Sequence, residues 1–171
     1  MIKSLSAGLE YSDEWGKNIK VTGSYFFSDS RPRQEQDIFR QTFYANDSTA
    51  SMNRQTFSNN LNQNHRFNLR FEYQIDSMNS ILYTPTLTLQ HSENFSSDSS
   101  YTNSKTPLNE FLAITGKSQN SNERNGTNLG NNILFRHKFS KTGRTVTLGW
   151  NNTSNNSESD GLTISNNSFF R

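Results

Sequence analysis

Three short polar turns, at residues 12–16, 76–79 and 140–143, are each flanked by stretches in which apolar and polar residues alternate. Alternation with a period of two is the pattern of a β-strand that has one apolar face. The turns are evenly spaced, with 63 positions from Asp13 to Asp76 and 65 from Asp76 to Lys141. The pattern therefore predicts three hairpins joined by long connections.

The alternation is clearest in residues 66–75, where Phe, Leu, Tyr and Ile alternate with Arg, Asn, Glu and Gln. A packed soluble sheet covered on both faces does not tolerate such charges, whereas a face turned toward a water-filled lumen does. Similar stretches lie at residues 4–11, 18–27, 81–90, 129–139 and 145–151, and a last run at 162–165 begins another strand. Seven strands follow from this count. Pro85 removes one ladder donor, so we expect a bulge or weakened pairing there.

The connections, at residues 29–62, 93–119 and 152–161, are rich in Asn, Ser, Thr and Gln. In the first, residues 38–44 and 54–57 form a possible extra strand pair that extends beyond a membrane and raises the count to nine. The runs at 94–103 and 118–128 fit either continued strands or mobile loops, and the sequence leaves both open.

Composition points to a membrane wall. Only 30% of the 171 residues are hydrophobic and mean hydropathy is −0.89, yet 12% are aromatic, with 13 Phe. A barrel wall needs apolar side chains on one face only. No run approaches the ~20 apolar residues of a membrane helix. We therefore predict an all-β fold: an antiparallel up-and-down transmembrane β-barrel wall, a partial barrel of about seven to nine strands with short periplasmic turns and long extracellular loops.

The strand pattern assigns residues to faces. Five charged side chains are candidates for the lumen face, where they either select solute or form cross-strand ion pairs: Arg66, Arg70, Glu72, Arg136 and Lys138. Six apolar side chains are candidates for the lipid face: Phe67, Leu69, Phe71, Ile133, Phe135 and Leu148. Five aromatic residues near the short turns are candidates for an interfacial girdle: Tyr11, Trp15, Tyr73, Tyr83 and Phe139.

Little in the chain indicates chemistry. The net charge of +2 is scattered, so no polybasic patch suggests nucleic acid, and there are 0 Cys. His65, His91 and His137 lack metal-ligand spacing. Acidic residues in the connections could offer oxygens to calcium, but a solvated loop explains them better: Glu93, Asp98, Glu158 and Asp160. No nucleophile elbow or phosphate-binding glycine loop is visible, so we expect neither an enzyme nor a cofactor.

Residues 71–81, FEYQIDSMNSI, resemble a hairpin of outer-membrane β-barrel proteins of the Bacteroidetes type, which are related to TonB-dependent receptors. Residues 11–17, YSDEWGK, and 135–144, FRHKFSKTGR, are similar to neighbouring periplasmic turns of the same barrels. The resemblance implies a large barrel in the bacterial outer membrane, a plug, and energised uptake of an extracellular solute. The chain shows no plug, signal peptide, energy-coupling box or closing strand with a terminal aromatic residue.

We accordingly expect residues 1–171 to be a section of one barrel domain. Its partners would be outer-membrane lipid, the remainder of the barrel, a plug and a solute. Two alternatives remain: a soluble secreted all-β module that binds glycans, and an adhesin built from stacked strands. Recovery of the native protein from washed membranes only with detergent would separate the barrel from a soluble module.

Overall fold

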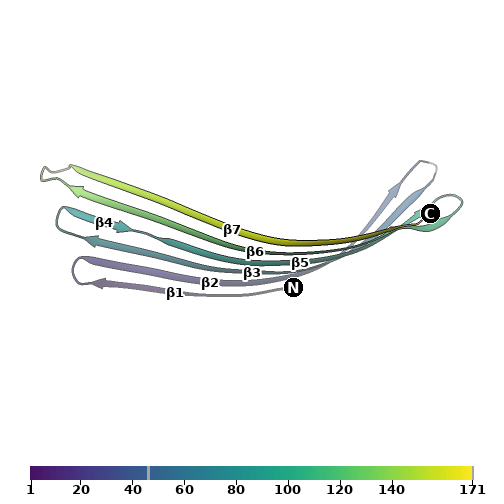
Figure 1. The fold of residues 1–171 in the computed structure, drawn as a ribbon, viewed down its shortest axis with the longest axis horizontal. Coiled ribbons are helices and arrows are strands. Elements are labelled where there is room, and N and C mark those ends of the chain that lie inside the picture. The colour runs from purple at the N-terminus through teal and green to yellow at the C-terminus, as the bar shows by residue number, and fades with distance from the viewer. Residues whose placement is uncertain (46, 171) are drawn as a thin grey trace.

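The computed structural model describes residues 1–45 and 47–170, and these form one antiparallel β-sheet (Figure 1). The all-β prediction is therefore confirmed. The strands are β1 (Ile2–Trp15), β2 (Ile19–Phe43), β3 (Thr49–Gln74), β4 (Asn79–Tyr83), β5 (Thr86–Lys105), β6 (Glu110–Lys138) and β7 (Thr145–Phe169). Among the described residues, no helix is long and apolar enough to cross a membrane.

Neighbours in sequence are neighbours in the sheet, as in an up-and-down wall. β1 pairs β2, β2 pairs β3, and β6 pairs β7. β4 and β5 share one position between β3 and β6: β4 occupies the end near the short turns and β5 the remainder. The break between them falls at Pro85, where local disruption was expected. The ladder is bridged there because Leu69 donates its amide to the Pro85 carbonyl at 3.1 Å, and Thr84 donates to Asn132 at 2.8 Å.

The connections at one end of the sheet are the predicted short turns. Gly16 and Gly143 adopt φ values of 73° and 81°, which a residue with a Cβ adopts only with strain. In the middle turn, a side-chain oxygen of Asp76 accepts hydrogen bonds from the amides of Met78 and Asn79, both at 2.7 Å. These bonds and the Asn79 side chain lower the pKa of Asp76. Each turn is therefore held by local chemistry that the sequence displays.

The opposite end differs from the sequence-based expectation of long loops. Residues 29–43, 49–62, 93–105, 110–119 and 152–161 are strand, and the hairpins there close through short connections after Phe43 and Lys105. The expected extra pair, 38–44 and 54–57, belongs almost entirely to β2 and β3. The runs at 94–103 and 118–128 are also strand, and they pair with each other in β5 and β6. Polar residues hydrated on both faces keep the backbone ladder but lose the apolar alternation from which strands are recognised.

The strand count of seven agrees with the prediction, but the division differs. The stretch 81–90 is split into β4 and β5, while 145–151 and 162–165 are parts of the single strand β7. β2, β3, β6 and β7 have 25, 26, 29 and 25 residues. At about 3.4 Å per residue they are roughly 85–100 Å long, about three times the ~30 Å hydrocarbon thickness of a bilayer.

The sheet is open and forms a single layer. No pairing joins β1 to β7 among the described residues, so each of these strands presents an unpaired edge. Within the same part of the chain, the only hydrophobic side chain classed as buried is Val21, at 5% exposure. A soluble domain of this length buries most of the surface of its unfolded chain. Most apolar residues of this sheet are therefore not covered by a second protein layer within the described residues.

Candidate functional site: an apolar belt and a basic face

The ladder register sorts the apolar and charged candidates onto opposite faces. One row of partners crosses the sheet from Ile19 through Tyr73, Ile81 and Phe135 to Leu148. Paired residues in an antiparallel ladder point to the same side, and the side alternates along each strand. All six predicted lipid-facing residues lie on the side of this row, which we name the belt face. The five predicted lumen candidates lie on the other side, which we name the polar face.

The belt face carries a continuous apolar belt at the end near the short turns. On β1 it spans eleven positions from Leu5 to Trp15, and on β2 nine positions from Ile19 to Phe27. A strand that crosses a bilayer at a tilt needs about 9–11 residues. The remaining members are Tyr73, Phe71, Leu69 and Phe67 on β3; Ile81, Tyr83, Leu87 and Leu89 on β4 and β5; Phe135, Ile133 and Leu129 on β6; and Val146, Leu148 and Trp150 on β7.

The upper limit of the belt is lower on β7 than on β1, although it does not fall at every strand, because Leu89 on β5 lies one belt row above Phe67 on β3. On β1 the last belt residue is Leu5, whose ladder row continues through Asp29, Gln63, His91 and Asn125 to Glu158. The last belt residue on β7 is Trp150, eight positions short of Glu158. Eight residues are about 27 Å along a strand, and five steps between strands are about 24 Å across it. The limit therefore slants by roughly 48° to the ladder rows.

Four of the five predicted girdle residues lie on the belt face: Tyr11, Trp15, Tyr73 and Tyr83. Trp15 is 52% exposed, and Trp150, a belt residue outside that prediction, is 53% exposed. The Trp15 indole donates to the Tyr11 hydroxyl at 3.2 Å, and that hydroxyl donates to Asp13 at 3.0 Å. The Tyr83 hydroxyl donates to Asn131 at 2.8 Å. The polar tips of these three rings thus have protein partners.

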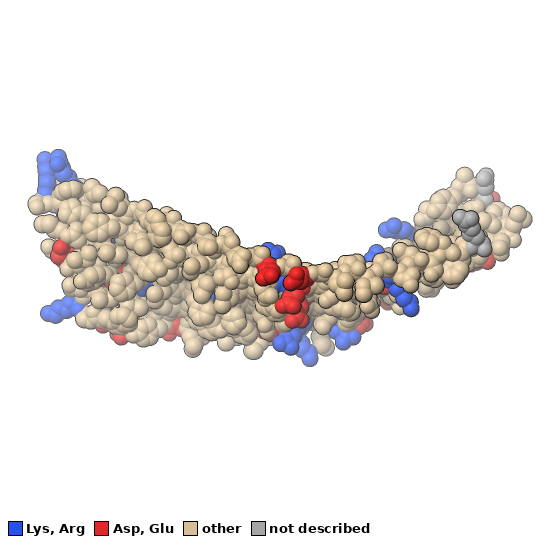
Figure 2. All heavy atoms as spheres, in the orientation of Figure 1, with Lys and Arg blue, Asp and Glu red and all other residues tan. Residues whose placement is uncertain are grey.

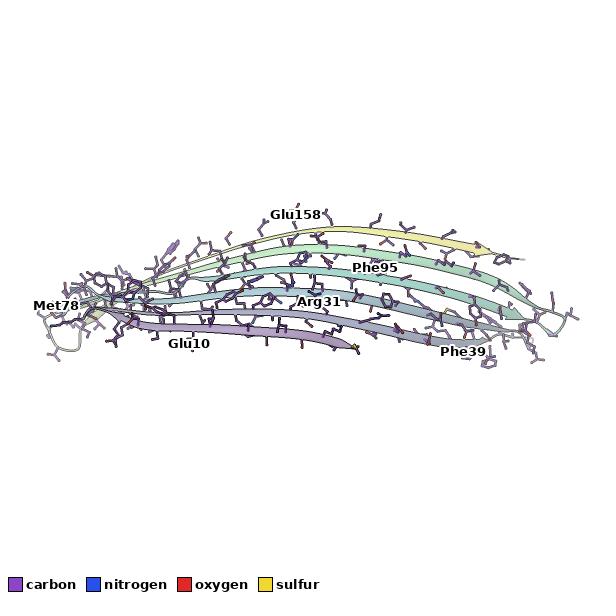
Figure 3. The ribbon with its side chains drawn as sticks, turned by 90° about the horizontal axis from the view of Figure 1, so that it is seen from below. Glu10, Arg31, Phe39, Met78, Phe95 and Glu158 are labelled. Atoms are coloured by element: carbon purple, nitrogen blue, oxygen red, sulfur yellow. The ribbon has the colours of Figure 1, made fainter. Side chains whose placement is uncertain are left out.

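On β2, charged residues follow directly after the last belt residue, Phe27, on the same face. Arg31 donates to both carboxylate oxygens of Asp29 at 2.9 and 3.1 Å, and Gln63 donates to the second at 2.8 Å. Figure 2 shows a broad uncharged surface over the half of the sheet near the short turns and acidic residues gathered near its middle. In Figure 3, Arg31 and Glu158 lie in that middle region, and Met78 marks the short-turn end. The belt therefore ends at a sharp change in polarity.

His91 lies at this boundary, in the same ladder row as Asp29 and Gln63. His91 lies 3.1 Å from a carboxylate oxygen of Glu93 and 3.9 Å from one of Glu123, and its other contact is the Asn125 side chain at 2.8 Å. The hydrogen bonds to Asn125 and Glu93 raise the pKa of His91. The protonated ring would neutralise part of the local negative charge.

The polar face holds two ion pairs near the short turns. Lys20 meets Glu14 across β1 and β2 at 2.6 Å, and Arg70 meets Glu72 along β3 at 2.6 Å. Among the described residues, no acidic side chain lies within 4.0 Å of the charged groups of Arg66, Arg136 or Lys138. The predicted ion-pair lattice is therefore partial, because three of the five candidates carry uncompensated charge.

The two faces have opposite charge, a feature that sequence reasoning missed. The comparison covers the ladder rows from the short turns to the row of Arg40. There the polar face carries eight basic and four acidic residues, and the belt face carries four basic and eight acidic residues. The polar-face residues are Lys20, Arg40, Arg54, Arg66, Arg70, Arg124, Arg136, Lys138, Glu10, Glu14, Glu72 and Asp98. The belt-face residues are Lys3, Arg31, Arg33, Lys117, Asp13, Asp29, Glu35, Asp37, Glu93, Glu123, Glu158 and Asp160. Continuing the alternation of faces along each strand into the polar connections would have revealed this charge difference.

The acidic residues assigned to loops lie in strands instead. Glu93 and Asp98 are in β5, and Glu158 and Asp160 are in β7. Asp98 accepts hydrogen bonds from Thr56 at 2.6 Å and from Arg54 at 2.8 and 3.0 Å, and these bonds lower its pKa. In the part of the chain that the structure describes, no group of three or more His, Cys, Asp or Glu is placed to hold a metal ion.

The other two histidines contact neighbours across the ladder. His65 accepts or donates a 2.8 Å hydrogen bond with the Tyr25 hydroxyl, and its ring lies 4.9 Å from that of Phe27. His137 bonds to the Asn79 side chain at 2.8 Å and packs edge-on against Phe139 at 4.7 Å. Phe139 therefore lies beside His137, a belt-face residue, and its place in a girdle stays a prediction.

Comparisons with known proteins give no family. No protein-family model and no curated protein matches the chain. Two solved structures resemble it weakly. The membrane pore complex of pneumolysin has a TM-score of 0.17 and 5% identity over 95% of this chain, which spans 31% of that protein. OccK10 (OpdN) of Pseudomonas aeruginosa has a TM-score of 0.15 and 5% identity. The match covers 99% of this chain and 96% of the OccK10 chain. Neither likeness carries an argument.

Proposed function

We propose that this chain forms part of the wall of a transmembrane β-barrel in a bacterial outer membrane. The observation that carries the proposal is the slant of the apolar belt. Strands of membrane barrels tilt by about 35–45° from the axis, so a flat hydrocarbon layer crosses their ladder obliquely. A slant of roughly 48° across β1 to β7 is close to that value. The slant is the average from β1 to β7 and supports a tilted barrel wall more than a flat sheet.

The single layer supports the same proposal. The belt residues other than Val21 are exposed or half-buried although they form a contiguous apolar surface, and the described sheet supplies no second layer to cover them. Hydrocarbon would cover that surface without requiring any further protein element. The unpaired edges of β1 and β7 would then pair with further strands, since lipid cannot satisfy open backbone groups. We infer that the remainder of the barrel supplies these strands.

The strands beyond the belt would stand outside the membrane. The short turns would lie on the periplasmic side, and the polar halves of β2, β3, β5, β6 and β7 would project into the extracellular medium. On the resemblance of residues 71–81, the parent protein would be TonB-dependent-receptor-like. The wall would then surround a plug and meet an extracellular solute with its Asn- and Ser-rich surface. Its role would be passage and recognition, not catalysis.

Membrane fractionation of the full-length protein tests the proposal. Outer membranes are washed with alkaline carbonate and then extracted with a mild detergent. We expect the protein to stay with the membranes through the wash and to appear in the detergent extract. Recovery of a folded, detergent-free monomer from the soluble periplasm would contradict the proposal and favour the soluble glycan-binding module.

A further inference from the structure

The charge difference between the two faces extends the proposed function to a class of solute. Within the belt rows of the polar face, Lys20 and Arg70 are neutralised by Glu14 and Glu72. Arg66, Arg136 and Lys138 are not, so they contribute net positive charge. Further along the same face, Arg124 donates to the Ser157 hydroxyl at 2.9 Å and has no acidic partner within 4.0 Å among the described residues.

A shallow hollow of about 200 Å³ lies on the polar face near the short turns. Its lining includes the basic residues Lys20, Arg70 and Arg136, the acidic residue Glu72, which pairs with Arg70, and the uncharged residues Ser80, Leu82 and Leu134. Planar guanidinium groups bind carboxylate and phosphate in a fixed fork geometry. The two leucines offer apolar contact to the uncharged part of a solute. The hollow thus combines anion donors with a small apolar surface.

The placement of these charges strengthens their effect. A surface lined by one sign of charge and enclosed by low-dielectric walls produces a potential of several kT and concentrates ions of the opposite sign. The belt face carries net negative charge over the same strands, so the positive potential belongs to one side of the sheet and not to the whole chain. An anion would therefore be attracted to the polar face specifically.

We propose that the polar face attracts small anionic solutes and holds their phosphate or carboxylate group in the hollow at Arg136, which has no acidic partner among the described residues, with the ion-paired Lys20 and Arg70 beside it. The proposal rests on the proposed function, because the polar face must line the lumen to act on a solute in transit. The wall would then favour anions over cations of the same size. Arg66 and Lys138, on the same face, would extend the positive field along the lumen.

The absence of cysteine from the chain allows a direct test of the local potential. A Ser80→Cys variant places a thiol in the hollow, and a Ser121→Cys variant places one on the belt face, in a hollow that it shares with Glu93 and Glu123. Both full-length variants are treated in isolated outer membranes with an anionic and a cationic methanethiosulfonate reagent. The ratio of the two modification rates reports the potential at each thiol and cancels differences in thiol reactivity.

We expect the anionic-to-cationic rate ratio to be at least about tenfold higher for Ser80→Cys than for Ser121→Cys, given potentials of several kT. Adding Arg136→Gln to Ser80→Cys should lower the ratio several-fold, whereas adding Lys117→Gln, which removes a belt-face charge, should leave it unchanged. Inorganic phosphate at constant ionic strength should slow modification of Ser80→Cys and not of Ser121→Cys.

An equal or lower ratio at Ser80→Cys, no response to Arg136→Gln, or no protection by phosphate would each overturn the proposal. These outcomes are separable from failure of the proposed function. The rate ratio measures the field at the polar face wherever the protein is found, whereas the carbonate wash and detergent extraction measure membrane integration alone.

Discussion

Arg54 donates two hydrogen bonds, at 2.8 and 3.0 Å, to a single carboxylate oxygen of Asp98 across the β3–β5 ladder. Thr56 donates a third to the same oxygen at 2.6 Å. This group lies in the half of the sheet beyond the belt, where polar residues predominate and apolar contacts such as that between Phe57 and Phe95 are isolated. Charge-assisted bonds of this kind add to those contacts between neighbouring strands there.

Removing the Asp98 charge should loosen that half of the sheet. We expect Asp98→Asn to destabilise it by about 1 kcal/mol, a value that allows for solvent screening of the half-exposed Arg54. Asp160→Asn, which removes a β7 carboxylate outside any described ion pair, should change little. Amide hydrogen exchange in residues 49–60 and 94–105 measures the effect, and equal exchange in the two variants would contradict it.

The same carboxylate predicts a loss of stability in acid. Its hydrogen bonds lower the pKa of Asp98 below the usual 3.8, so its contribution is present above pH 3.8 and is lost as the pH falls through the lowered value. Wild-type exchange rates in residues 94–105 should therefore approach those of Asp98→Asn only in strong acid. Convergence of the two proteins already at pH 5 would refute this assignment.

His91 gives the opposite pH dependence at the belt boundary. Because its folded pKa is raised, protonated His91 stabilises the folded state fully below pH 6.5, and this contribution disappears as the pH rises through the raised value. A His91→Gln variant should lose this step, which begins above pH 6.5 in a plot of unfolding free energy against pH. Persistence of the step in the variant would place its origin elsewhere.

Neighbouring residues on opposite faces provide a test of face assignment. Leu69 lies in the middle row of the belt, and Asn68 points to the polar face. An Arg on the lipid face near the midplane destabilises a membrane barrel by about 2–4 kcal/mol, whereas an Arg in a wet lumen does not. Leu69→Arg should therefore lower the unfolding free energy in vesicles by that amount and Asn68→Arg by less than about 1 kcal/mol. Similar losses for both would mean that the two faces share one environment.

The short turns make a further prediction about backbone conformation. Gly143 has a φ of 81°, and no heavy atom lies within 4 Å of the position that a Cβ would occupy there, so a substitution meets conformational strain and no steric contact. Gly143→Ala should destabilise the hairpin by about 1 kcal/mol, and Gly143→Asn by less, because Asn tolerates the left-handed region better. Urea unfolding of both variants in vesicles gives the comparison. Equal stability of Gly143→Ala and wild type would exclude the strained turn.

The sequence predicted the belt half of the sheet well because burial against a single apolar phase imposes strict alternation. Residues 66–75 and 129–139 show it directly, and Pro85 marked the break between β4 and β5. The far half was predicted only in part, with extra strands proposed at 38–44 and 54–57 and the runs at 94–103 and 118–128 left open between strand and loop, because no such constraint acts there. Asn94 pairs with Asn122 and Ser99 with Lys117, pairs whose strand conformation is held by backbone bonds and not by residue type.

The lumen and lipid candidates were assigned to opposite faces only from the alternation of residues along each strand. The structure also separates these two groups onto opposite faces of the sheet. The charge difference between the faces was not predicted. It depends on Glu35, Asp37, Glu93 and Glu158, which lie in the parts of β2, β5 and β7 that were taken for connections. The slant of the belt likewise required the register between strands, which no single strand displays.

The most direct measurement of the central claim uses the two native tryptophans, Trp15 and Trp150, both on the belt face. The full-length protein is folded into vesicles whose lipids carry bromine on the acyl chains, and its fluorescence is compared with that in unbrominated vesicles. Trp15→Phe and Trp150→Phe variants resolve the two signals. The control combines Trp15→Phe and Trp150→Phe with Gln90→Trp, so that its single tryptophan lies on the polar face.

We expect bromine to quench both native tryptophans strongly and the Gln90→Trp control weakly. That result would show that the apolar side of the sheet meets hydrocarbon at both of its edges while the other side remains in water. Quenching of the control as strong as that of Trp15 and Trp150, or no quenching of either native residue, would contradict the account.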